Sequence, residues 1–145
     1  MKKLLTVLTV LVLALAFTVC AAETEQKPMR VDLDLSKMSG TIVYSQVYNM
    51  MVEPEKYLGR IIRIAGLYDE YQDPETEVVY FACVIPDATA CCAQGIEFVW
   101  AGEHTWPDDY PALGTTVTVT GRLESYLENE YEYLHLVDAE VVWES

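Results

Sequence analysis

Four residues in one short stretch carry most of the chemistry that this sequence offers. Cys83 precedes an adjacent pair, Cys91 and Cys92, and Asp87 lies between them. Thiolates bind zinc and copper(I) well, and a structural zinc ion takes four ligands in a tetrahedron. The three thiolates and the local carboxylate would complete such a set, so the stretch predicts a zinc or copper site. The spacing is not the usual C-x-x-C arrangement, and adjacent cysteines that both bind one ion strain the backbone.

Two other interpretations of these cysteines stay open. Thiols oxidise outside the cytoplasm, so Cys83 could form a disulfide with Cys91 or Cys92 and leave one odd thiol. The cysteines could equally stay reduced and fill space as small apolar residues. A thiol redox enzyme would need an accessible thiol of low pKa beside a positive group. Residues 64–103 contain no Lys, Arg or His, so enzymatic activity is not expected.

A second candidate site is aromatic. Tyr126, Tyr131 and Tyr133 lie close together near the C-terminus, where a hairpin is expected. Small barrels bind ligands on such loops, so these tyrosines are candidates for a ligand groove, with packing in the core or at the rim as the alternative.

The other polar residues have simpler explanations. His104 and His135 are expected to pack in a loop and a strand rather than to bind a metal. A run of alternating glutamates, Glu124 to Glu132, has no glycine to fold a calcium loop and is interpreted as a solvated turn. The sequence contains no phosphate-binding glycine loop, no H-E-x-x-H and no G-x-S-x-G.

The first 22 residues have the pattern of a secretory signal peptide. Lys2 and Lys3 precede an almost wholly apolar run, 4–19, which ends in the small residues Ala21 and Ala22. The run is short for a membrane span, although an uncleaved anchor is the alternative. Cys20 is a candidate for lipidation, which would tether the protein to the outer surface of a membrane. Export to the outside of the cytoplasm is therefore expected.

The chain without its signal peptide is strongly acidic. It keeps all 23 acidic residues and seven of the nine basic ones, a formal charge of −16. Such a surface repels phosphate backbones and anionic lipids. The expected partners are a small ligand, a metal ion or an envelope protein, and nucleic acid is excluded.

The pattern along the chain predicts one mainly β domain. Residues 23–40 read as a linker or a loosely docked arm, and 41–52 have helical spacing that Pro54 ends. Strands are expected at 61–68, 78–85, 95–100, 115–123 and 131–143, with acidic turns at 71–77 and 124–130. Gly66 indicates a bulge or tight bend, and a second bulge is expected near Asp138. One helix and five strands over 41–145 predict a small closed barrel.

The segment PEKYLGRIIRIAG, residues 54–66, resembles the entry to the first strand of many bacterial OB-fold domains. There, a helix ends in a proline-containing turn, followed by a tyrosine, a glycine and an alternating strand. The resemblance implies an OB-like five-stranded barrel. This chain lacks the usual OB helix between the third and fourth strands, because residues 106–114 are short and proline-rich, and the helix at 41–52 would cap the barrel instead.

Residues 89–99 loosely resemble the paired-cysteine segment in the C-terminal domain of a family of permease-associated bacterial membrane proteins of uncharacterised function. That resemblance implies a role in the cell envelope and identifies no reaction. The sequence thus predicts an exported or membrane-tethered OB-like binding module of unknown ligand. A metal-handling accessory protein and a thiol redox enzyme, both built on Cys83, Cys91 and Cys92, are the alternatives.

Overall fold

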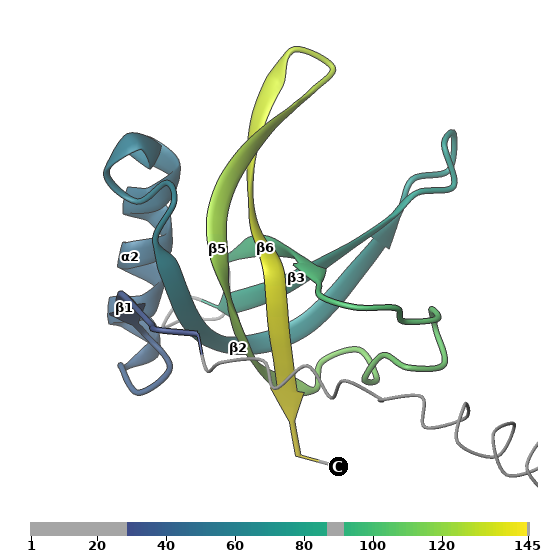
Figure 1. The fold of residues 1–145 in the computed structure, drawn as a ribbon, viewed down its shortest axis with the longest axis horizontal. Helices are drawn as coiled ribbons and strands as arrows, with labels where there is room; N and C mark the ends of the chain where they lie inside the picture. The colour runs from purple at the N-terminus through teal and green to yellow at the C-terminus, as the bar shows by residue number, and fades with distance from the viewer. Residues whose placement is uncertain (1–28, 87–91, 145) are drawn as a thin grey trace, which may run out of the picture.

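The computed structural model describes residues 29–86 and 92–144, and its regular elements are mostly strands (Figure 1). The elements are β1 (Leu33–Asp34), α2 (Gly40–Val52), a short 3-10 helix η2 (Pro54–Lys56), β2 (Ile61–Gln72), β3 (Val79–Pro86), β4 (Ala93–Trp100), β5 (Thr116–Glu128) and β6 (Tyr131–Trp143). Within the described residues, the prediction of a mainly β fold with one α-helix is confirmed.

Five of the strands form a ring of pairings. The order is β2–β3–β4–β6–β5, and β5 pairs again with β2. All of these pairs are antiparallel except β4–β6, which is parallel. The ring closes because β2 is long enough to pair with two neighbouring strands. Residues Ile61–Leu67 pair with β5 and residues Leu67–Gln72 pair with β3.

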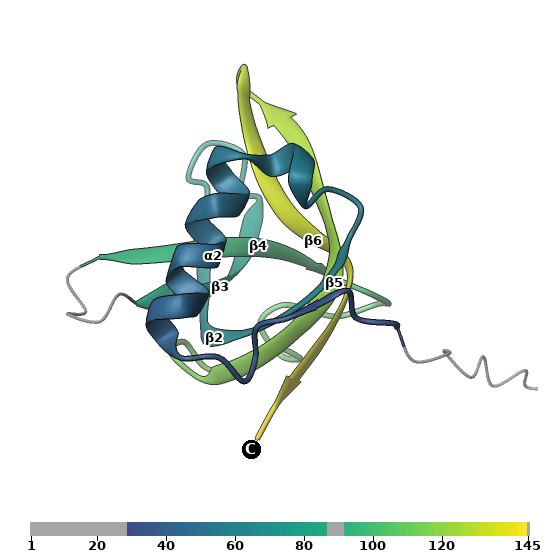
Figure 2. The ribbon, with the colours of Figure 1, turned by 90° about the vertical axis from the view of Figure 1, so that its left-hand side faces the viewer.

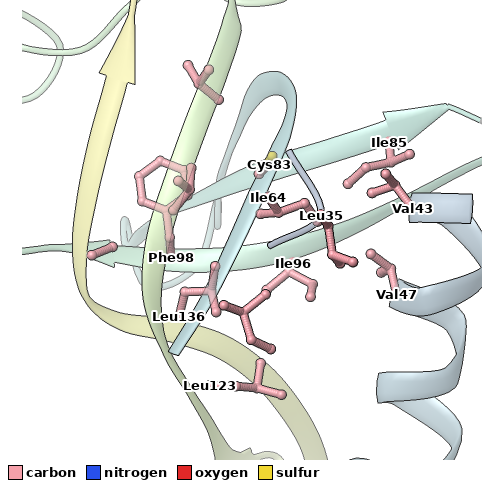
Figure 3. Packing of buried hydrophobic residues seen from close by; sticks show 14 of the residues in the cluster. Leu35, Val43, Val47, Ile64, Cys83, Ile85, Ile96, Phe98, Leu123 and Leu136 are labelled. Carbon is pink, nitrogen blue, oxygen red and sulfur yellow. The ribbon is translucent and has the colours of Figure 1, made fainter. Parts of the chain in front are cut away.

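The helix α2 covers one side of this ring (Figure 2). Val43, Val47 and Met50 follow one another at helical spacing, and all three are buried. In Figure 3 the side chains of Val43 and Val47 point towards Ile85 of β3 and Ile96 of β4. Pro54, which lacks a backbone donor, begins η2 just beyond the helix. The predicted helix at 41–52 and its end at the proline are confirmed.

The segment before α2 packs against the ring. Leu33 and Asp34 pair in parallel with Ile62 and Arg63 of β2. Leu35 is buried at 1% exposure, and its backbone N–H donates to the carbonyl oxygen of Arg63. The part of the predicted linker from residue 33 onward is therefore held by strand pairing and by a core side chain.

Alternation along the strands puts one set of side chains into a common core. In β5, Val117, Val119 and Leu123 are fully buried, while the neighbouring residues 118 and 122 are only partly so. Towards the other end the core becomes aromatic, where Tyr110 stacks on Phe81 with ring centroids 4.2 Å apart. The core thus runs from the aliphatic side chains beneath α2 to this aromatic cluster.

The predicted turn over residues 124–130 is wrong. β5 continues to Glu128, and only Asn129 and Glu130 form the turn, with φ angles of 49° and 72°. Two residues in this left-handed region are typical of a tight hairpin whose twist matches its strands. β2 likewise extends through Gln72, into the turn predicted at 71–77. Glutamates alternating with tyrosines form paired strands here, because tyrosine favours strands and alternation keeps the carboxylates out of the core.

Both predicted irregularities of the sheet have a structural counterpart. Asp138 has a φ of 52°, and the β5–β6 register shifts between Thr120 and Arg122, which confirms the predicted bulge. Gly66 lies where β2 passes from β5 to β3, and its register is unbroken, so it marks a bend. A Cβ atom there would lie 2.6 Å from the carbonyl oxygen of Val84 and 2.8 Å from the Sγ atom of Cys83.

We therefore predict that Gly66→Ala lowers the free energy of unfolding by about 2 kcal/mol, the usual cost of overpacking a core. Urea unfolding would measure it. The control is Gly40→Ala, where an added Cβ meets nothing within 4 Å at the start of α2. That variant should be unchanged or slightly more stable, since alanine favours helices. Equal stabilities of the two variants would contradict the role of Gly66.

Candidate functional site

The structure places Cys83 in the core. Its side chain has 0% exposure and points inward from β3 beside Ile64 (Figure 3). Burial raises the pKa of this thiol to about 12, which disfavours the thiolate that metal binding and nucleophilic attack require. Cys83 is a free thiol. Its surroundings fit the interpretation of a small apolar core residue.

Of the other residues of the predicted cysteine site, the structure describes only Cys92, and it is not brought to Cys83. Cys92 is exposed at the start of β4, next to Ala93, which pairs with Pro86, whereas Cys83 pairs with Ile96. Asp87, Cys91 and the candidate lipidation residue Cys20 lie outside the described residues. Within residues 29–86 and 92–144, no three His, Cys, Asp or Glu side chains lie close enough to hold a metal ion.

A different site lies between two hairpins. The β2–β3 and β5–β6 hairpins project from the ring, at the upper right and the top of Figure 1. Between them is a cleft of about 330 Å³. From β2 to β4 it is lined by Tyr71, Tyr80 and Glu97, and the β5–β6 hairpin contributes Glu128 and Tyr133. Strand pairing positions these groups, since Tyr71 lies directly opposite Tyr80, and Ala82 lies opposite Glu97.

Two hydrogen bonds tie the hairpin to the sheet across this cleft. The hydroxyl of Tyr80 donates to Oε1 of Glu128 at 2.5 Å, and that of Tyr126 donates to Oε2 of Glu97 at 2.6 Å. The carboxylate bond raises the pKa of Tyr80 to about 12. Burial, and then the bond to Glu97, raise the pKa of Tyr126 as well. Both phenols therefore stay protonated donors at neutral pH, and each glutamate keeps oxygen lone pairs for a further partner.

Tyrosine rings form the walls of the cleft and its surroundings. Tyr71 stacks on Tyr80 with centroids 6.5 Å apart, and Tyr126 stacks on Tyr133 at 5.5 Å. The three tyrosines of the predicted groove therefore have different positions. Tyr133 lines the cleft and Tyr126 holds Glu97, whereas Tyr131 is 69% exposed and lines neither this cleft nor the hollow beside it.

The charge around the cleft is of one sign. Its lining contains five carboxylates and no Lys, Arg or His; the carboxylates are Asp69, Glu70, Asp73, Glu97 and Glu128. The ion pairs of the described residues lie elsewhere and use the acidic residues Asp34, Glu53, Glu124 and Asp138. Five like charges without a cationic neighbour create a negative potential that a positive ligand would relieve.

Some of these carboxylates also have structural partners. Glu70 accepts hydrogen bonds from the hydroxyl of Tyr68 at 2.5 Å and from the indole N–H of Trp106 at 2.9 Å. Asp73 accepts backbone N–H bonds from Thr76 and Glu75, which lower its pKa and fix the β2–β3 turn. Within the described residues, Glu97 and Glu128 each accept a single hydrogen bond at the carboxylate, against two for Glu70 and for Asp73, and are therefore the better candidates for binding a ligand.

The two histidines pack against rings. His104 stacks on Trp100 with centroids 3.5 Å apart, and one ring nitrogen lies 2.9 Å from the carbonyl oxygen of Ala101. His135 packs on Tyr126 at 4.7 Å. Burial lowers the pKa of His135, against the opposing effect of Glu97. Both histidines take the packing roles predicted from the sequence.

Comparisons with known proteins give this site no counterpart. No protein-family model, curated protein or solved structure matches the chain. The described residues contain no helix long and apolar enough to cross a membrane.

The thiol of Cys83 gives the stability a predictable dependence on pH. Its pKa is about 12 in the folded protein against an ordinary 9.0, so the unfolded chain loses this proton first as the pH rises. The contribution of the buried, protonated thiol to the free energy of unfolding is complete below pH 9 and is lost between pH 9 and pH 12. Measured by urea unfolding over this range, the free energy of unfolding should decline less steeply with pH for Cys83→Ala than for the unmodified protein. Parallel declines would contradict the buried, protonated thiol.

Proposed function

We propose that this chain is an exported, OB-like binding module of the cell envelope that binds an organic cation in the cleft between its β2–β3 and β5–β6 hairpins. The observation that carries the proposal is the cleft itself. It combines tyrosine faces with five carboxylates that have no basic neighbour in the lining. Amines and guanidinium groups bind such sites by charge-assisted hydrogen bonds and by contact with aromatic faces.

The order of the strands supports an OB-like barrel. That fold is a five-stranded Greek-key barrel that binds ligands over its second and third strands and on the loops joining strands one to two and four to five. In this ring, those positions correspond to β3, β4 and the two hairpins that flank the cleft. The binding position expected for the fold and the cleft therefore coincide.

The charge of the cleft supports an organic cation as the ligand. OB-fold domains that bind oligonucleotides must attract phosphates, whereas five carboxylates repel them. A bare metal ion would need several of these side chains to converge, and the described residues contain no such group. An organic cation is large enough to reach carboxylates that stand apart.

Isothermal titration calorimetry with spermidine tests this function. We expect Glu97→Gln and Glu128→Gln each to weaken binding about tenfold, the effect of losing one charged contact. Glutamine keeps an oxygen to accept the tyrosine hydroxyl, so the hairpin should stay in place. Binding should also weaken as sodium chloride is added, because salt screens the attraction between the cation and the carboxylates of an open cleft.

The matched control is Glu132→Gln, which removes the same charge from the same hairpin but outside the cleft lining. It should change the affinity for spermidine by less than about twofold, as expected for an exposed charge. If it weakens binding as much as Glu97→Gln does, the protein attracts cations by net charge alone and the proposed site is wrong.

Export is tested separately by the intact mass of the protein recovered from the producing bacterium. We expect a chain that has lost about 22 residues, as for a cleaved signal peptide. Full-length protein in the cytosol would overturn the proposed location. Cys20→Ala distinguishes the tethered form, because only a lipidated chain would move from the membrane to the soluble fraction.

A further inference from the structure

A second hollow adjoins the cleft and differs from it in character. It measures about 400 Å³ and shares Tyr80 and Glu97 with the cleft. The rest of its lining is mostly apolar and includes Val79, Phe81, Phe98, Val99, Trp100 and Tyr110. We call this hollow the apolar slot. Because the two spaces share Tyr80 and Glu97, one ligand can occupy both, with a cationic group in the cleft and an apolar group in the slot.

The slot opens where β3 and β4 separate. These strands pair from Pro86–Ala93 to Ala82–Glu97 and share no pair beyond that point. The other edge of β3 is occupied, because Val79, Tyr80 and Phe81 pair with residues of β2. The other edge of β4 is occupied by β6. Two strand edges therefore face the slot without pairing with each other, and such edges are templates for an added strand.

We propose that the slot and the cleft together bind an extended basic segment of a partner protein, with an apolar side chain in the slot and a Lys or Arg in the cleft. This inference rests on the proposed function, whose cation it identifies as a basic side chain. A peptide fits better than a small amine because it has backbone groups to offer to the edge of β3. It also alternates side chains along an extended strand, as two neighbouring spaces of different polarity require.

The negative charge of the cleft favours a positively charged segment of the partner. Every charged side chain that lines the cleft is acidic, and Glu97 brings that charge to the rim of the slot. The exposed apolar side chains Val78 and Val99, at 47% and 53% exposure, flank the slot. A segment of alternating basic and apolar residues would cover these valines while neutralising the carboxylates.

Calorimetry with two peptides of equal charge tests the inference. The probes are acetyl-KFKVK-amide and acetyl-KGKGK-amide, with spermidine and phenethylamine for comparison. We expect KFKVK to bind at least about tenfold more tightly than KGKGK, since burying one large apolar side chain has an effect of this size. KFKVK should also bind at least about tenfold more tightly than phenethylamine, which lacks the backbone and the second charge.

Two matched variants locate the effect. Val99→Trp fills the slot, whereas Val142→Trp makes the same change at a valine of β6 that is similarly exposed, at 56% against 53%, and lies outside the slot. We expect Val99→Trp to reduce the preference for KFKVK over KGKGK to about twofold or less, as for loss of the buried apolar group. Val142→Trp should keep the preference, and neither variant should change the affinity for spermidine.

The outcomes separate the two proposals. If spermidine binding depends on Glu97 and the two peptides bind equally, the peptide inference fails and the proposed function stands. If phenethylamine binds as tightly as KFKVK, the occupant is a small amphipathic cation and the peptide inference is overturned. If Val142→Trp abolishes the preference as Val99→Trp does, the slot is not the site. Absence of binding by spermidine and by both peptides overturns the two proposals together.

Discussion

The structure depends on one strand that pairs with two neighbours in succession. β2 leaves β5 and joins β3 at Leu67, the residue that is paired with both. The bend is possible because residue 66 is a glycine. Its backbone lies so close to Val84 and Cys83 that a side chain at this position would collide with them. Without this bend the ring of pairings would open into a sheet with unprotected edges. Beyond the bend, β2 still contributes the buried Tyr68 to the core and then continues to Tyr71, which lines the cleft.

The cleft follows from how far the two hairpins extend beyond the core. A strand that continues past the core has no apolar face to bury, so other interactions must hold it. Here stacked tyrosine pairs and hydroxyl–carboxylate bonds do so, as between Tyr126 and Glu97. The same interactions collect negative charge on one surface and hold it in a fixed geometry. The residues that hold the hairpins in place are thus the residues that we propose bind a cation.

The sequence predicted the interior of the fold better than its surface. The helix was predicted from its apolar spacing, and the five ring strands were predicted from short apolar runs, β-branched residues or alternation, because these patterns report on burial. The bend was predicted because a glycine inside a strand, here Gly66, is typical of a bulge or a tight bend, and a bulge was also predicted near Asp138. The length of the hairpin at Asn129 was missed, since alternating Glu and Tyr over 124–128 looked like a solvated loop. Such alternation also fits a strand that is exposed on one face.

The candidate site was predicted only in part, for the same reason. Tyr126 and Tyr133 were identified as part of a groove. Glu97, which accepts a hydrogen bond from Tyr126, and Tyr80, which donates one to Glu128, lie on other strands, far away in sequence. One sequence does not show which distant residues face each other. The sequence feature that pointed to the cleft was the clustering of Tyr and Glu at both predicted turns. The cysteine stretch attracted attention by residue type, whereas burial of Cys83 depends on which face of β3 points inward, a matter of one-residue register.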